Sequence, residues 1–264
     1  MKKTLILTVA AGMLFAASPA FAQGIIVKKD GTEINTTGKI TVKEGDYRYT
    51  DGKTKAGRSI KKGDVKWAWC PKPDAVRKLD ESGKGTSAGY LKLAGEFRYV
   101  SWEPYCLLQA AKVEIAAGNK AGAVAILEKL QNYKRINPKN EKDVMDAYEL
   151  LIKTYIEQGA FDKAIPVADS LVNSSNDEVA CSALFAKGDA LKAKAGVSGD
   201  KEDLKFAALA YFQAALLFPK SEKNAAALLA AYNCMRDAKD ARAQKFADLL
   251  RKNHPRSPEA AELK

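Results

Sequence analysis

A short pattern that recurs after 41 residues constrains the fold of this chain more than any other feature. Residues 118–123 read GNKAGA and residues 159–164 read GAFDKA, so each has a glycine followed five positions later by an alanine. Such a glycine is typical of the end of one helix, and the alanine then lies in the next helix. The same lag aligns further apolar positions: Leu107 with Tyr148, Ala110 with Leu151, Leu127 with Ala168 and Leu130 with Leu171. We therefore predict units of two antiparallel helices, which must stack because no single pair can bury its apolar face.

The residues of these units resemble the tetratricopeptide repeat. The second unit carries the pattern best, in Tyr148, Leu151, Tyr155, Gly159, Phe161, Ala164 and Ala168. The third unit has Leu184, Gly188 and Leu191 on its first helix, and Leu204, Ala207, Tyr211, Ala214 and Pro219 on its second. The fourth ends with Ala243, Ala247, Leu250 and Pro255. The resemblance implies a superhelix of about four helix pairs within residues 90–264.

Several places depart from the pattern. The first unit has Glu114 and Lys120 where the family has tyrosine and an aromatic residue. The third unit has about seven extra residues, which we expect in a longer turn at residues 195–200. Pro166 should bend the second helix of unit two or remove a hydrogen bond there. Residues 251–261 are similar to repeat ends in periplasmic proteins of the YbgF and BamD kind.

The residues before Pro71 have a different character, with short β-type runs separated by turn signals. The runs are residues 24–27, 39–42, 47–49, 58–60 and 65–69. They predict a small antiparallel β-barrel or rolled sheet over residues 23–71, loosely similar to Sm-like barrels. Residues 72–89 are predicted as a linker, with one short helical piece around residues 74–79. The expected fold class is α+β.

The N-terminus has the three parts of a secretory signal peptide. Lys2 and Lys3 precede an apolar run over residues 5–17, and Ala20-Phe21-Ala22 supplies the small residues of a cleavage site. We predict a signal peptide over residues 1–22, cleaved after Ala22. The alternative is a membrane anchor, but the run is short for a span. Because Gln23 stands where a lipoprotein has cysteine, we expect a periplasmic or secreted protein without membrane insertion.

The charge of the chain is strongly positive. Its 43 Lys and Arg against 32 Asp and Glu give +11, or about +9 without Lys2 and Lys3. A basic excess favours anionic partners, and secretion favours acidic glycans, cell-wall polymer, lipid head groups or acidic proteins over nucleic acid. The alternative is an ordinary solvated basic surface.

The sequence offers few residues for catalysis or metal binding. His254 is the only histidine, and the cysteines are too widely spaced for a C-x-x-C or zinc motif. The segment Gly83–Ser87 lacks the context of a phosphate-binding loop and is better explained as part of the linker. We therefore expect no enzyme, no metal and no cofactor. Cys70 and Cys106 are the candidate disulfide, whereas Cys181 and Cys234 are expected as buried thiols in helices.

The family resemblance implies a binding groove lined by the first helix of each pair. Its expected lining comprises Tyr105, Leu108, Lys112, Glu149, Lys153, Phe185, Asp189, Lys192, Tyr232 and Arg236. Four of these, Lys112, Lys153, Lys192 and Arg236, form a basic row suited to a carboxylate or an acidic segment. The alternative is that they are ordinary exposed charges.

A second candidate surface lies on the β domain. Trp67 and Trp69 alternate on one strand and so share a face, with Lys61, Lys62 and Lys66 nearby. The tryptophans could instead fill the core of the domain or its contact with the helices, which we favour. The leading hypothesis is a non-enzymatic envelope scaffold or adaptor that binds other proteins or peptide segments through the groove. The alternative is a module that binds cell wall or anionic glycan through the β domain, with the helices as a spacer.

Overall fold

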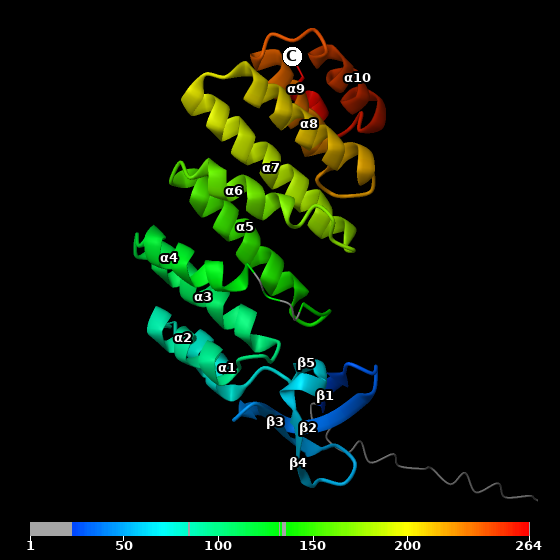
Figure 1. Ribbon diagram of the computed structural model, residues 1–264. Coiled ribbons are helices and arrows are strands. Elements are labelled where there is room, and N and C mark those ends of the chain that lie inside the picture. Colours follow the sequence, from blue (N-terminus) through cyan, green and yellow to red (C-terminus); the bar gives the residue numbers. More distant parts are fainter. Residues whose placement is uncertain (1–22, 84, 132, 134–135, 264) are drawn as a thin grey trace, which may run out of the picture.

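The computed structural model describes residues 23–83, 85–131, 133 and 136–263, and it confirms the α+β class. A five-stranded antiparallel sheet forms the N-terminal end, and helices follow it in a curved stack that ends at α10 and α11 (Figure 1). The predicted signal peptide, residues 1–22, lies outside the described residues. Within the part of the chain that is described, no helix is long and apolar enough to cross a membrane.

The sheet has the strand order β4-β3-β2-β1-β5, so β4 and β5 are its edges. The strands are β1 (Gln23–Lys28), β2 (Glu33–Lys43), β3 (Asp46–Asp51), β4 (Gly57–Lys61) and β5 (Val65–Trp69). β1 to β4 follow one another as hairpins, and β5 then pairs with β1 after a 3-10 turn. Ile26, Ile40, Tyr47 and Ala68 are fully buried and form the core side of the sheet.

The helices form four pairs with an additional helix pair before them and a short helix after them. The leading pair is α1 (Asp74–Glu81) and α2 (Ser87–Glu96). The four pairs are α3 (Trp102–Ala116) with α4 (Lys120–Leu127), α5 (Glu141–Glu157) with α6 (Phe161–Asp169), α7 (Asp177–Ser198) with α8 (Lys201–Leu217), and α9 (Asn224–Asp237) with α10 (Ala243–Asn253). Helix α11 (Pro258–Ala261) closes the stack. Membership of the tetratricopeptide family itself stays a prediction.

A residue in the left-handed conformation follows the first helix of each of the four pairs. Gly118, Gly159 and Gly199 have φ of +77°, +71° and +72°, and Lys239 has φ of +58°. Only glycine adopts this region without steric cost, which explains the two glycines of the repeated pattern. In the fourth pair a lysine occupies the position, so the sequence signal is missing there although the turn is the same.

The longer turn expected at residues 195–200 is wrong. α7 continues to Ser198 and α8 begins at Lys201, so the extra residues lengthen the helices. The physical reason is local: Ala195 is buried against the stack, Gly199 ends α7, and the Asp200 side chain accepts a hydrogen bond from the Glu202 backbone N–H as the N-cap of α8. Pro166 lies inside α6 without interrupting it, so its cost is the bond that its missing N–H cannot make.

The expected linker at residues 72–89 is mostly helical and packed, which corrects that prediction. Asp80 of α1 accepts hydrogen bonds from the hydroxyls of Tyr90 in α2 (2.7 Å) and Tyr105 in α3 (2.8 Å), and Lys72 Nζ lies 2.5 Å from it. Composition suggested a linker because glycine, serine and lysine are frequent there, but the half-buried carboxylate of Asp80 fixes α1 against its neighbours.

The sheet and the first helices share one hydrophobic core. The backbone N–H and hydroxyl of Ser101 both donate to the Ala68 carbonyl at 2.9 Å, and Trp102 Nε1 donates to the Cys70 carbonyl at 2.7 Å. These bonds cover the outer edge of β5, which would otherwise expose unpaired backbone groups. A single cluster of buried side chains runs from Ile26 in β1 to Ala190 in α7.

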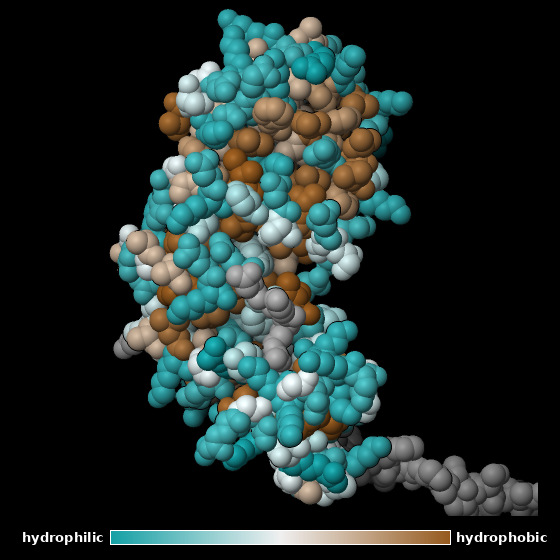
Figure 2. Space-filling view, viewed as in Figure 1, coloured by the Kyte–Doolittle hydropathy of each residue, from teal (hydrophilic) through white to brown (hydrophobic). Residues whose placement is uncertain are grey.

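Apolar side chains gather on the surface over α8. Among the described residues, the exposed large hydrophobic side chains are Ile136, Val197, Phe206, Leu209, Leu216 and Leu217, and four of these six belong to α8. Figure 2 shows the corresponding brown area over α8 and α10.

Candidate functional site

We call the side of the stack that carries the first helices of the four pairs the first-helix surface. Every residue predicted to line the groove belongs to α3, α5, α7 or α9. Leu108, however, is only 1% exposed and belongs to the core, so its predicted role in the groove is wrong. Tyr105 is half-buried and turned toward α1, where it donates to Asp80 and lies edge-to-face with Trp102 at 5.5 Å. The usable surface therefore lies mainly on α5, α7 and α9.

An ion pair crosses the first-helix surface from α5 to the start of α9. Lys223, the residue before α9, places Nζ 3.2 Å from Glu149 Oε1 of α5, and the same Nζ lies 5.9 Å from the centre of the Phe185 ring of α7. The side chains of α5 and α7 and the residue before α9 therefore meet on one side of the stack.

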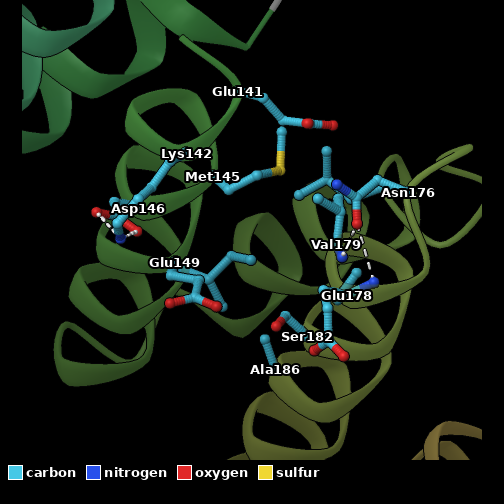
Figure 3. A pocket seen from close by; sticks show the side chains of 13 residues that line it. Glu141, Lys142, Met145, Asp146, Glu149, Asn176, Glu178, Val179, Ser182 and Ala186 are labelled. Carbon is cyan, nitrogen blue, oxygen red and sulfur yellow. Dashed lines mark hydrogen bonds and ion pairs between the residues drawn. The ribbon is translucent and has the colours of Figure 1, made fainter. Parts of the chain in front are cut away.

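A pocket of about 260 Å³ opens between α5 and α7 on this surface (Figure 3). In Figure 3, Met145 and Glu149 project from α5 toward α7, and Val179, Ser182 and Ala186 line the opposite wall. Apolar side chains also include Ile152, Leu171 and Ala183. We call this cavity the α5–α7 pocket.

The rim of the α5–α7 pocket is acidic, although the chain as a whole is basic. Its lining has four carboxylates, Glu141, Asp146, Glu149 and Glu178, against one cation, Lys142. Two of these carboxylates are already paired within the chain, Asp146 with Lys142 at 3.0 Å and Glu149 with Lys223 at 3.2 Å. An apolar base inside an acidic rim can hold an apolar side chain next to a Lys or Arg.

The acidic rim follows from how the helices begin. Glu141 lies in the first turn of α5 and Glu178 in the first turn of α7, where the helix dipole stabilises negative charge. Asn176, the N-cap of α7, accepts hydrogen bonds from the Glu178 and Val179 backbone N–H groups and also lines the pocket. The first-turn acids were readable from the sequence. Their convergence was not, because it depends on how α5 and α7 pack.

The predicted basic row occupies exposed positions toward the carboxyl ends of the same helices. Lys112, Lys153, Lys192 and Arg236 are all exposed. Arg236 bonds to Asp237 at 3.0 Å and stacks on the Tyr232 ring at 5.5 Å, so part of its binding capacity is used within the chain. The row is separate from the α5–α7 pocket, and its role in anion binding stays a prediction.

Asp189 is at the surface, but its carboxylate is turned toward the next helix. It accepts a 2.5 Å hydrogen bond from the Tyr211 hydroxyl of α8, and the Tyr211 ring contacts Phe185 edge-to-face at 5.1 Å. Burial raises the pKa of the Asp189 carboxyl above its usual value, and the bond from Tyr211 only partly offsets this. Asp189 thus joins α7 to α8 rather than offering a free carboxylate.

The second candidate surface on the β domain is partly formed. Trp67 and Trp69 are half-buried on the face of β5 opposite the buried Ala68. A bulge leaves Lys66 unpaired, because Val27 pairs with Trp67 while Lys28 pairs with Val65.

The lysines predicted for this surface differ in their surroundings. Lys61 and Lys66 are exposed, but Lys62 Nζ lies over the Tyr99 ring at 3.4 Å. Lys139 from the loop before α5 lies 5.0 Å from the Trp69 ring, so one tryptophan contacts the helical part. The tryptophans therefore lie at the surface and the domain junction rather than inside the core.

The predicted disulfide is not formed. Cys70 and Cys106 are both buried free thiols, and so are Cys181 and Cys234. The two sulfur atoms face different surroundings: burial raises the pKa of Cys70 while the Ile40 backbone bonds to it, whereas burial and the nearby Asp80 raise the pKa of Cys106 to about 12. None of the four is a reactive thiolate at neutral pH.

The single histidine has a structural contact. His254 Nε2 lies 2.7 Å from Asn224 Oδ1, and Asn224 Nδ2 donates to the Ala215 carbonyl at 2.7 Å, so the pair joins the end of α10 to α8 and α9. Within the described ranges, no group of three or more His, Cys, Asp or Glu could hold a metal ion. That the protein is not an enzyme stays a prediction.

Comparison of the chain with protein-family models, curated proteins and solved structures found no match. The case for function therefore rests on the geometry of the first-helix surface and of the β domain.

Proposed function

We propose that this protein is a non-enzymatic scaffold or adaptor of the cell envelope that binds a segment of another protein on its first-helix surface. One observation carries the proposal: the α5–α7 pocket on the first-helix surface combines an apolar base with an acidic rim. Stacked helix pairs commonly present such surfaces to extended or helical partners. The N-terminal signal pattern supports a periplasmic or secreted location.

The chemistry of the pocket specifies the segment that it binds. An apolar side chain enters between Met145 and Val179, and a neighbouring Lys or Arg pairs with Glu178 or Glu141. The basic row alone would instead favour an acidic segment. Both ideas are compatible when the segment is basic at the pocket and acidic near Lys153 and Lys192.

A random peptide library selected on the immobilised protein tests this proposal without a known partner. We expect enriched peptides with Lys or Arg beside a large apolar residue. Ala186→Phe fills the pocket without changing its charge and should abolish the enrichment. Ala125→Phe on exposed α4 is the matched control and should leave it intact. Enrichment that survives Ala186→Phe, or no enrichment at all, contradicts the proposal.

The exposed aromatic face of β5 favours a second candidate function, the binding of cell wall or anionic glycan. Half-buried Trp67 and Trp69 next to exposed Lys66 could stack on sugar rings and pair with acidic groups. Because the sheet shares its core with α2 to α6, point substitutions test this better than truncation. Trp67→Ala should release the protein from purified cell wall, whereas Ala186→Phe should not. Equal retention of both variants argues against this second function.

A further inference from the structure

The exposed face of α8 has the pattern of a helix that packs against another helix, yet none of the residues that the structure describes covers it. Phe206 and Leu209 near its start and Leu216 and Leu217 at its end are 49–62% exposed. Their spacing of 3, 7 and 1 residues places all four on one face of a helix with 3.6 residues per turn. We call these four residues the α8 stripe.

A pocket lies beside the carboxyl end of the α8 stripe. It has a volume of about 510 Å³ and is lined by Phe212, Ala215, Leu216, Leu228, Leu249 and His254, among others. Each copy of the chain thus carries a protruding Phe206 at one end of α8 and a largely apolar hollow at the other. A surface with both parts on one helix is complementary to itself when the second helix runs in the opposite direction.

The charges at the two ends of the stripe agree with the same antiparallel arrangement. Glu202 lies four residues before Phe206, on the same helix face, where Lys205 also contacts it at 2.6 Å, and Lys220 lies three residues after Leu217. When Phe206 of one helix lies opposite Leu217 of the other, Glu202 comes opposite Lys220 within about one residue. Both contacts occur twice across a two-fold axis near the middle of α8.

We propose that the α8 stripe pairs in antiparallel fashion with the α8 stripe of a second copy of this chain, with Phe206 of each copy next to the pocket beside Leu216 of the other. The interface is isologous and closes as a dimer rather than growing into a filament. It lies on second helices and leaves the α5–α7 pocket open, so each dimer presents two copies of the first-helix surface. This inference does not depend on the proposed adaptor function.

Sedimentation velocity of the purified protein over ~1–100 µM tests the pairing. We expect a concentration-dependent dimer that Leu216→Glu converts to a monomer with unchanged helical circular dichroism. Ile136→Glu is the matched control, since Ile136 is also exposed and apolar but precedes α5, and it should leave the dimer intact. A wild-type protein that stays monomeric at the highest concentration, or a dimer that persists in Leu216→Glu, overturns the proposal.

A charge exchange tests the antiparallel direction. Glu202→Lys and Lys220→Glu each place like charges opposite one another twice, and each should raise the dimer dissociation constant roughly tenfold or more. The double variant Glu202→Lys/Lys220→Glu should return the dissociation constant to the wild-type value. If the double variant dimerises no more tightly than the single variants, this antiparallel register is wrong.

A lipid surface is the other possible partner of the α8 stripe, and vesicles with anionic lipid test it. Binding of monomeric protein to these vesicles through Leu216 would assign the stripe to a lipid surface and overturn self-pairing.

Discussion

Small residues determine how closely the helices of this protein pack, and Gly188 shows the effect most clearly. A Cβ atom at Gly188 would lie 2.6 Å from Tyr211 Cε1, closer than such atoms approach in folded proteins. The Tyr211 ring cannot move away freely, because its hydroxyl bonds to Asp189 and its face contacts Phe185. The resemblance to tetratricopeptide repeats singled out Gly188 and Tyr211 separately, but only the structure shows that they touch.

Gly188→Ala should therefore lower the free energy of unfolding by about 1–3 kcal/mol through overpacking. Gly196 of the same helix is the control, because a Cβ there meets nothing within 4 Å and its φ is not left-handed. Gly196→Ala should raise the unfolding free energy by about 0.5–1 kcal/mol, since alanine favours the helix. Urea unfolding followed by circular dichroism measures both. Equal effects of the two substitutions would contradict this packing argument.

Asp80 links stability to pH. Burial alone would raise the pKa of Asp80, but bonds from Lys72, Tyr90 and Tyr105 outweigh it and hold the pKa below its usual value. A lowered pKa means that the carboxylate stabilises the fold above the unfolded-state pKa of ~3.9, and that this contribution is lost as pH falls through the folded-state pKa. Asp80 should thus contribute to stability at neutral pH and not in strong acid.

Asp80→Asn should accordingly lower the unfolding free energy at pH 7 by about 1–3 kcal/mol. The difference from wild type should shrink below about pH 4, and thermal unfolding at several pH values measures it. Asp189→Asn is the matched control: Asp189 also accepts a tyrosine hydroxyl, but burial raises its pKa, so removing its charge should cost no stability at pH 7. A constant difference for Asp80→Asn across the pH range would refute the linkage.

At the scale of helices and strands, the sequence predicted correctly those features that depend on one residue and its immediate neighbours. Gly118 and Gly159 located two helix ends, because few other residues adopt φ near +70°. Residues 195–200 were misassigned because the same Ala, Gly and Ser occur in turns and in the last turn of a long helix. The helical segment at 72–89 was underestimated, since its stability comes from Asp80 and its distant partners.

Lys239 offers a direct test of the repeated turn. Its φ of +58° is a conformation that costs a residue with a Cβ ~1–2 kcal/mol. Lys239→Gly should therefore raise the unfolding free energy by about 1 kcal/mol, whereas Gly159→Ala, at the equivalent position with φ +71°, should lower it by a similar amount. Thermal unfolding of the two variants measures these shifts. No gain from Lys239→Gly would show that the lysine side chain itself stabilises the turn.

At the scale of the whole molecule, the sheet and the first helices should unfold together. All three tryptophans, Trp67, Trp69 and Trp102, lie in or beside the sheet, and their fluorescence reports on this end of the chain. Leu151 of α5 belongs to the cluster that the sheet shares, whereas Leu228 of α9 belongs to a separate cluster. The sequence predicted two domains and a linker because it could not show this shared core.

Leu151→Ala should shift the tryptophan fluorescence transition to lower urea, with a loss of about 2–5 kcal/mol. Leu228→Ala, an equally buried leucine, should shift that transition less and affect mainly the circular dichroism of the last helices. If Leu151→Ala leaves the fluorescence transition in place, the sheet is an independent folding unit.

The candidate site also belongs to this scale, because its charge arises from two helices brought together by stacking. Sequence reasoning predicted a groove on the first helices of the pairs and emphasised the basic row, since Lys112, Lys153, Lys192 and Arg236 recur at similar repeat positions. The α5–α7 pocket depends on the offset between α5 and α7 and on the contact of Lys223 with Glu149. Neither the offset nor the contact between Lys223 and Glu149, which lie 74 residues apart, can be inferred from neighbouring residues in the sequence.

Photo-crosslinking in the native envelope tests the binding function most directly. A photoreactive amino acid in place of Ser182, inside the α5–α7 pocket, should capture one defined protein through a segment that contains Lys or Arg beside a large apolar residue. The same amino acid in place of Ala125 on α4 should not capture that protein. Capture from both positions alike, or capture from Ala125 alone, would contradict binding on the first-helix surface.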